Sequence, residues 1–315
     1  SLRTNSEFEY QNGTLSELQF SISENNLLGL HKIAAARFDM DLGEFAIGPY
    51  YYDPFLFGTH FQFESSADAV FNRQTGAFEG TRSSTFLSYP LWNLDRTWGG
   101  DLQVTHSDEV ERRFQGVDLL PYDNPDTAAE ESVGQEYRFR TFMAQLRGLY
   151  ATGEKVEHRL GLGYRFELQQ PEFVPDFPDD DDLRAAFRRD VMAPRERNSA
   201  VFASYDVFIP KWITYRNITS FDLPEEESVG PYAALEVAPT LEAFGSLENF
   251  LELRTTFGAL VDLWRDGYVW AEVSGESRLR GDDWIDQGYT GLLHVATPQA
   301  FEFARIVAQT RLDTY

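Results

Sequence analysis

The sequence predicts an all-β fold, an antiparallel up-and-down transmembrane β-barrel of up to about sixteen strands. The first observation is the stretch Thr59–Asn72, where every second residue from Phe61 onward is apolar or small and most residues between are polar. This period of two indicates a strand with one apolar face and one wet face. At about 3.3 Å per residue the strand is roughly 40 Å long, which exceeds soluble strands of about 5–6 residues and suits a tilted bilayer crossing. The second observation is that no run of about 18 apolar residues is present, so the sequence holds no transmembrane helix.

The alternation recurs along the first half of the chain. An Asn12-Gly13 pair between two alternating runs is a hairpin signal. In Glu157–Gln169 the odd positions carry two arginines and two glutamates, and these must face a polar interior because an arginine at mid-depth in lipid costs about 2–4 kcal/mol. The strands expected here are Glu7–Tyr10, Leu15–Glu24, Ile33–Leu42, Phe45–Tyr52, Thr59–Asn72, Phe78–Leu91, Trp98–Ser107, Glu136–Tyr150 and Glu157–Gln169.

Two long acidic loops are expected, at Asp108–Val133 and Glu172–Asn198. A short helix over Leu183–Ala193 is predicted inside the second loop, capped by the aspartates that precede it. Counting strands from the amino-terminal end places both loops at the same end of the sheet. Outer-membrane barrels have this asymmetry, with long loops outside and short turns on the periplasmic side.

The second half predicts further strands and an acidic turn at Phe221–Gly230. In the last strand the apolar residues lie at even positions, so Tyr315 falls out of phase with them. We therefore expect a barrel that is cut before its last strands. The strands expected here are Ala200–Ile209, Ile213–Ser220, Tyr232–Ala238, Leu251–Leu263, Tyr268–Leu279, Tyr289–Ala296 and Phe301–Leu312.

Composition and motifs exclude several classes of function. The net charge of -24 disfavours nucleic-acid binding, which needs a basic surface. The absence of cysteine excludes disulfides, zinc–thiolate sites and cysteine nucleophiles. The five histidines form no metal-binding pair, and His106-Ser107-Asp108 is a poor triad because adjacent strand residues point in opposite directions. We expect no enzyme activity, no catalytic residue, no metal and no cofactor, although a soluble β-sandwich or a barrel-borne enzyme is a third interpretation.

Two segments resemble a known family. The run NNLLG (Asn25–Gly29), followed by an alternating strand and by YYYDPFLFG (Tyr50–Gly58), resembles the barrel of the bacterial surface-antigen superfamily. That superfamily includes the BamA- and TamA-like assembly barrels and the two-partner-secretion transporters. The likeness is specific over Leu15–Asn72, and Arg216–Gly230 has a looser likeness to a mid-barrel hairpin. The residues that match the family motif are Tyr52, Asp53, Pro54 and Gly58.

The resemblance implies a single barrel domain over residues 1–315, without the family's periplasmic POTRA modules, in the outer membrane of a Gram-negative bacterium. It implies the insertion or export of proteins through a weak seam, whose first-strand side is formed by Glu7, Phe8, Glu9 and Tyr10. Arg280 and Gly281 match part of the family's Arg-Gly-aromatic lumenal tip, but Asp282 follows in place of the aromatic residue, which indicates an ordinary turn.

The partners implied are outer-membrane lipids and lipopolysaccharide, unfolded outer-membrane or exported protein substrates, and periplasmic accessory proteins. The alternative is a passive porin-like channel whose lumen charges set its selectivity.

Overall fold

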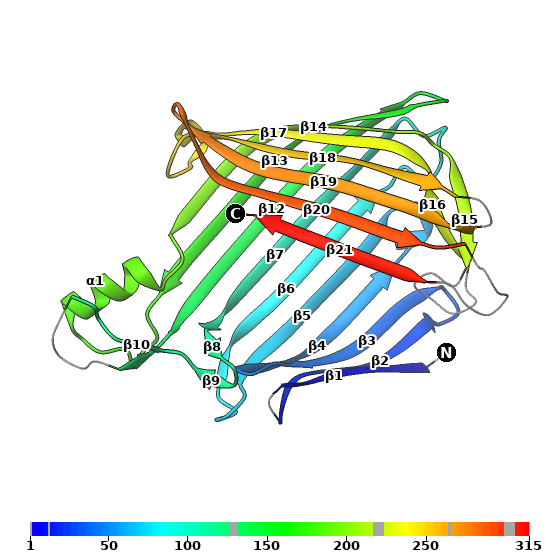
Figure 1. Cartoon of the computed structure of the whole chain (residues 1–315). Coiled ribbons are helices and arrows are strands. Elements are labelled where there is room, and N and C mark those ends of the chain that lie inside the picture. The colour runs from blue at the N-terminus through cyan, green and yellow to red at the C-terminus, as the bar shows by residue number, and fades with distance from the viewer. Residues whose placement is uncertain are drawn as a thin grey trace. The chain divides into compact units, whose positions relative to one another are not determined.

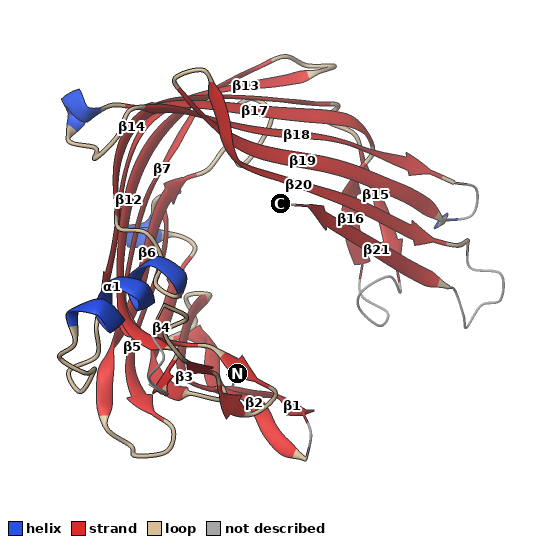
Figure 2. Cartoon of the chain, turned by 60° about the vertical axis from the view of Figure 1, so that its left-hand side comes forward, coloured by secondary structure: helices blue, strands red, loops and turns tan. Residues whose placement is uncertain are grey.

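The computed structural model describes residues 2–11, 13–126, 132–216, 224–263, 266–298 and 306–314. Its main feature is one large antiparallel sheet, shown in chain order in Figure 1 and by element type in Figure 2. The all-β fold class is therefore confirmed. Within the described ranges, no helix has the length and apolar character that a membrane crossing requires.

Fifteen strands form the sheet, in the order β1-β2-β3-β4-β5-β6-β7-β12-β13-β14-β17-β18-β19-β20-β21. The strands of the first half are β1 (Leu2–Gln11), β2 (Thr14–Leu27), β3 (Lys32–Met40), β4 (Glu44–Asp53), β5 (Gln62–Asn72), β6 (Phe78–Tyr89), β7 (Trp98–Arg112), β12 (Glu136–Thr152) and β13 (Glu157–Glu172). The remaining strands are β14 (Glu196–Phe208), β17 (Gly230–Thr240), β18 (Phe250–Asp262), β19 (Tyr268–Arg280), β20 (Asp283–Ala296) and β21 (Val307–Thr314).

The sheet is not closed into a barrel. A barrel requires its first and last strands to pair. In the part of the chain that the structure describes, β1 pairs only with β2 and β21 pairs only with β20. The predicted up-and-down order is therefore present, with fifteen strands in the sheet among the described residues, and the sheet is open.

The chain divides into two compact units, and the part of the sheet in each has one largely apolar face. Unit 1 comprises Ser1–Pro90, Asp101–Leu146 and Phe166–Asn198. Its register pairs apolar residues with apolar residues across neighbouring strands, because in-register antiparallel partners point to the same face. The pairs include Phe8↔Leu18, Phe20↔Phe38, Phe38↔Ile47, Phe45↔Phe71 and Phe63↔Leu87.

Unit 2 comprises Leu91–Gly100, Arg147–Arg165 and Ser199–Tyr315, and it has the same two-faced character. On one face Phe257 pairs with Val273, whereas on the other face Arg254 pairs with Glu276. Phe257 is 60% exposed and Leu162 is 65% exposed, so these apolar side chains are not covered by a second layer. Large exposed apolar side chains of this kind in unit 2 include Leu160, Leu162, Tyr164, Val201, Tyr205, Leu235, Phe257, Val261, Val273, Tyr289, Leu293 and Leu312.

An insertion in unit 1 supplies the largest cluster of buried apolar residues. It contains β8 (Phe114–Gln115), β9 (Asp118–Leu119), β10 (Pro121–Tyr122), β11 (Val133–Gly134) and α1 (Asp181–Asp190). Figure 1 labels α1, β8, β9 and β10 at one end of the unit 1 strands. Fully buried Phe187 of α1 contacts Tyr122 and Phe177, with ring centroids 5.3 Å and 4.8 Å away. The two long loops therefore pack together, as the prediction that they share one end requires.

A second insertion separates β14 from β17 in unit 2. The strands β15 (Trp212–Arg216) and β16 (Pro224–Ser228) pair with each other in a ribbon outside the main sheet. The predicted acidic turn at Phe221–Gly230 is therefore wrong over Pro224–Ser228, because Glu225, Glu226 and Glu227 pair with the preceding strand. Residues 217–223 lie outside the described residues.

Several predicted boundaries also differ from the structure. The strand expected from Thr59 begins at Gln62, because the short helix η1 (Leu56–Gly58) and a left-handed Gly58 precede it. The strand expected to end at Ser107 continues to Arg112, where the loop was expected. The predicted helix begins two residues earlier and ends three residues earlier, and the side chain of Asp180 accepts a hydrogen bond from the Leu183 amide at 2.9 Å. In the last predicted strand, residues 301–305 and Tyr315 lie outside the described residues.

Tyr122 and Asp190 join the two loops of the unit 1 insertion. The Tyr122 hydroxyl donates to Oδ2 of Asp190 at 2.7 Å. The hydrogen bond from Arg189 and then the one from Tyr122 lower the pKa of Asp190 below its usual 3.8. Burial, followed by the bond to Asp190, raises the pKa of Tyr122 to about 12.

The stability of the insertion should therefore fall in acid. A carboxylate with a depressed pKa stabilises the fold above its unfolded pKa, and this contribution is lost as the pH falls through the lower folded value. We expect the urea concentration at the unfolding midpoint of the insertion to be constant near neutral pH and to decrease at pH values below about 4. A fluorophore on a single cysteine at Asp182 reports this unfolding. Asp190→Asn should flatten the acid drop, and an equal drop in that variant would contradict the assignment.

Candidate functional site

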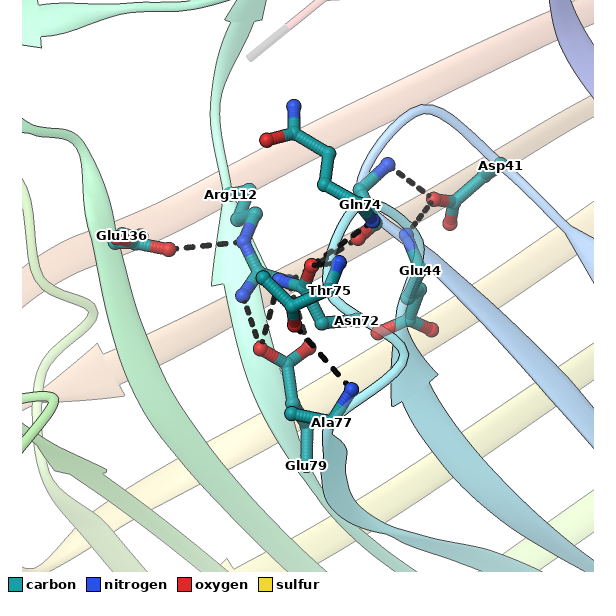
Figure 3. Close-up of polar contacts among 10 residues, drawn as sticks. Asp41, Glu44, Asn72, Gln74, Thr75, Ala77, Glu79, Arg112 and Glu136 are labelled. Carbon is teal, nitrogen blue, oxygen red and sulfur yellow. Dashed lines mark hydrogen bonds and ion pairs between the residues drawn. The ribbon is translucent and has the colours of Figure 1, made fainter.

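Arg112, at the end of β7, holds together three strands of unit 1 (Figure 3). Its guanidinium donates to Oε2 of Glu79 on β6 at 2.9 Å and to Oε2 of Glu136 on β12 at 2.8 Å, and its Nη2 also binds Oε1 of Glu79. The Arg112 side chain is 9% exposed. This geometry suits arginine, whose planar group presents five donors in a fixed fork.

The turns beside Arg112 are shaped by polar side chains (Figure 3). Oδ1 of Asp41 accepts hydrogen bonds from the Gly43 and Glu44 amides at 2.7 Å and 2.9 Å. The Asn72 side chain donates to Oε1 of Glu79 at 3.0 Å, so a turn residue is tied to the same carboxylate. Gly43 leaves room for the arginine, because an added Cβ would lie 3.1 Å from Cδ of Arg112. The β3–β4 and β5–β6 turns and three strand ends thus form one hydrogen-bonded cluster.

Arg165 is the centre of a similar cluster in unit 2. Its guanidinium donates to Oε1 of Glu236 at 2.8 Å and to Oε1 of Glu252 at 2.7 Å, and its side chain is 6% exposed. Arg254 also binds Glu252 at 2.7 Å, and Arg278 lies 3.7 Å from it. The ion pairs therefore run across β13, β17, β18 and β19 on the charged face, and each buried arginine has a compensating carboxylate.

The family-motif residues lie where β4 turns into β5. Asp53 is 1% exposed, and its carboxylate accepts from the Phe55 amide at 3.0 Å and from Lys32 at 2.9 Å. Lys32 begins β3 directly after the NNLLG turn, so the ion pair brings the two segments of the resemblance together. Pro54 follows in the turn, and Gly58 has a φ of 73°, a conformation that favours glycine. Tyr52 is half-buried and pairs in register with Ile33 and Glu64.

The other predicted residues lie in separate places. Glu7, Phe8, Glu9 and Tyr10 belong to β1, an edge strand that is exposed along its whole length. Arg280 ends β19, Gly281 follows in the turn with a φ of 62°, and Arg280 pairs with exposed Glu248 at 2.6 Å. Arg280 and Gly281 belong to unit 2, whereas Arg112, Asp53 and the β1 residues belong to unit 1.

The three neighbouring residues His106, Ser107 and Asp108 have separate partners. His106 lies 3.5 Å from the Thr81 hydroxyl, whereas Ser107 donates to Glu109 at 2.7 Å and Asp108 binds Arg138 at 2.6 Å, so the three neighbours are not a triad. In the part of the chain that the structure describes, no three His, Asp or Glu side chains are grouped to hold a metal ion. Arg112, Glu79 and Glu136 were not predicted as site residues, because charged residues on separate strands do not show in the sequence which of them pair.

Comparisons of the chain with family models, with curated proteins and with solved structures found no match. The resemblance of Leu15–Asn72 to the surface-antigen superfamily therefore stays a prediction.

Arg112→Met should destabilise unit 1 more than a matched surface change. It leaves Glu79 and Glu136 without their cation in a poorly hydrated place, and hydrogen bonds to charged groups contribute about 1.5–3 kcal/mol each. Arg280→Met removes an exposed pair and should cost less than about 1 kcal/mol. The urea concentration at the unfolding midpoint of each purified variant, compared with the wild type, measures the loss of stability. Equal midpoints for the two variants would show that the Arg112 cluster does not stabilise the sheet.

Proposed function

We propose that this chain is the wall of a transmembrane β-barrel in the outer membrane of a Gram-negative bacterium, and that its charged face lines a watery lumen. The observation that carries the proposal is the one-sided sheet: apolar side chains such as Phe257 and Leu162 stand exposed on one face, and the buried arginines occupy the other. A water-soluble protein rarely leaves an apolar area of this extent uncovered. Acyl chains would cover it, and the net charge of -24 would remain in the lumen and loops.

The polarity of the two faces decides which one meets lipid. Transferring Arg254 or Glu252 to the bilayer centre is unfavourable, by about 2–4 kcal/mol for an arginine. In contrast, each apolar side chain on the other face gains by leaving water, at about 25 cal/mol per Å² of apolar area removed. The lipid partner therefore belongs on the Phe257 face, with lipopolysaccharide near its outer end.

We further propose that the barrel belongs to the assembly and translocation superfamily and inserts or exports proteins. The support is the resemblance of Leu15–Asn72, together with the outer edge of β1, which includes Glu7–Tyr10 and has no strand partner within the described residues. A free strand edge presents a row of backbone donors and acceptors to an incoming strand. Unfolded outer-membrane or exported proteins would be the substrates, with periplasmic accessory proteins delivering them.

A passive porin-like channel is the second candidate. It is favoured by the ion-pair clusters around Arg112 and Arg165, because rings of charged side chains in a pore set ionic selectivity. Large, steady conductance in planar bilayers without any added protein supports this candidate over the first.

The membrane assignment predicts opposite outcomes for two neighbouring residues. Phe257 faces the apolar side of β18, and Thr256 faces the charged side, where it pairs with Ala234 and Ser274. Phe257→Arg should reduce the fraction of protein that inserts into lipid vesicles, at a cost of about 2–4 kcal/mol at mid-depth, whereas Thr256→Arg should insert like the wild type. The heat-modifiable shift in gel mobility measures insertion. Equal insertion of both variants would contradict the assignment.

The assembly proposal predicts that closing the seam abolishes activity. The chain contains no cysteine, so Glu7→Cys can be paired in turn with single cysteines along β21 and oxidised without background reactions. In vesicles of phosphatidylethanolamine and phosphatidylglycerol, the reduced protein should speed the folding of a urea-unfolded eight-stranded outer-membrane barrel. The oxidised protein should not. Undiminished activity after locking, or no disulfide at any position along β21, would count against the seam.

A further inference from the structure

The charged face of unit 2 is interrupted by an aromatic patch. Along β19 the residues on this face are Arg278, Glu276, Ser274 and Glu272, followed by Trp270 and Tyr268. Register places Leu260 of β18 and His294 of β20 beside Trp270, so the patch extends over three strands. Because ion pairs occupy the rest of this face, apolar side chains here indicate that something outside the sheet packs against them.

The ribbon β15–β16 covers one side of this patch. Tyr215 of the ribbon is fully buried, and its ring centroid lies 4.9 Å from that of Tyr268. Its hydroxyl donates to Oδ1 of Asp262 at 3.1 Å. Tyr215, Leu260, Tyr268 and Ala296 form a small buried cluster, which fixes the ribbon against the sheet.

Beside this cluster the patch is left as a cavity of about 860 Å³. The volume is within the range of small-molecule sites, roughly 300–1,000 Å³. Aromatic rings form much of its wall, and two of them are held by hydrogen bonds, because Trp270 donates to the Tyr232 hydroxyl at 2.8 Å and that hydroxyl binds Glu272. The aromatic and imidazole side chains that line it are Phe208, Trp212, Tyr232, Tyr268, Trp270 and His294.

His294 supplies a second, independent sign of a ligand. Its side chain is only 8% exposed, and its Nδ1 lies 3.4 Å from the Tyr268 hydroxyl. Within the described residues, its buried Nε2 has no hydrogen-bond partner. When Tyr268 donates to Nδ1, the ring proton is on Nε2, so the unpartnered atom is a donor. Buried polar atoms almost always have a partner, and an oxygen acceptor in the cavity would provide it.

Charged groups of both signs line the cavity. Arg147 and Arg159 line it together with Asp206 and Glu227. The Arg159 guanidinium carbon lies 4.7 Å from the ring centroid of Phe208, which holds the cation against the aromatic wall. Nε of Arg159 also lies 3.4 Å from Oε1 of Glu157. A guanidinium only donates hydrogen bonds, so a carboxylate ligand can accept from either arginine as well as from the imidazole. A cationic ligand would be repelled by both arginines at close range.

We propose that this cavity binds a small aromatic carboxylate, with its ring against the tryptophan and tyrosine walls and its carboxylate accepting hydrogen bonds from Nε2 of His294 and from the arginines. The site lies entirely within unit 2. It does not depend on the proposed function, because a soluble sheet with the same ribbon would have the same cavity.

The test uses the full chain and three matched probes in isothermal titration calorimetry: 2-naphthoate, neutral 2-naphthalenemethanol and cationic 2-naphthylmethylammonium. Naphthoate should bind with a stoichiometry near one, and about tenfold or more tightly than the ammonium. Trp270→Leu should weaken naphthoate binding, whereas Trp284→Leu, which changes an exposed tryptophan outside the cavity, should not.

Two variants of His294 distinguish a contact with the ligand from a structural role of the side chain. His294→Asn retains an amide near Nδ1 and loses Nε2, so it should weaken naphthoate binding about tenfold. His294→Gln places an amide near Nε2 and should bind nearly as tightly as the wild type. Equal affinity for the three probes, binding unchanged in Trp270→Leu and His294→Asn, or no binding above a detergent-only titration would each overturn the proposal.

Discussion

The structure depends on a register that keeps each side chain on its own face from strand to strand. In unit 1 the chain of partners Phe8, Leu18, Met40 and Phe45 stays on one face, and in unit 2 Leu235, Thr255 and Gly275 do the same. A slip of one residue at any of these pairs would move arginines and glutamates into the apolar face and phenylalanines into the charged one. The register shifts once between β1 and β2, where Ser16 of β2 is the extra residue, and once between β5 and β6, where Glu79 of β6 is the extra residue. Both lie near strand ends, where an extra residue disturbs few pairs.

Arginine suits the charged face because one side chain can bind carboxylates on several strands at once. Arg112 binds Glu79 and Glu136, and Arg165 binds Glu236 and Glu252, so each joins strands that are far apart in the sequence. Removing any partner would leave a poorly hydrated charge, which is why these clusters favour a single register as well as adding stability. Where the clusters end in unit 2, the aromatic patch and the ribbon take their place.

Much of the sheet could be predicted from the sequence, because a period of two identifies a strand and its faces locally. The strands around Phe63, Leu162 and Phe257 follow from this pattern alone. The Arg112 cluster could not be predicted, since the contact with Glu79 spans 33 positions and depends on how strands pair. The first strand of the ribbon overlaps the predicted strand Ile213–Ser220, whereas its second strand falls in the predicted turn, because three consecutive glutamates resemble a solvated loop. Only pairing such as that of Glu227 with Ile213 distinguishes a strand from a loop there. The cavity beside His294 likewise depends on where Tyr215 packs.

The central claim is that one face of the sheet meets lipid and the other meets water. Nitroxide labels at single cysteines along β5, from Phe63 to Phe71, test it most directly in reconstituted vesicles. Accessibility to oxygen, which concentrates in lipid, should peak at Phe63, Ser65, Ala67, Ala69 and Phe71, and accessibility to a water-soluble nickel chelate should peak at the polar positions between. Equal accessibility to the nickel chelate at the apolar positions and at the polar positions between them would contradict the claim.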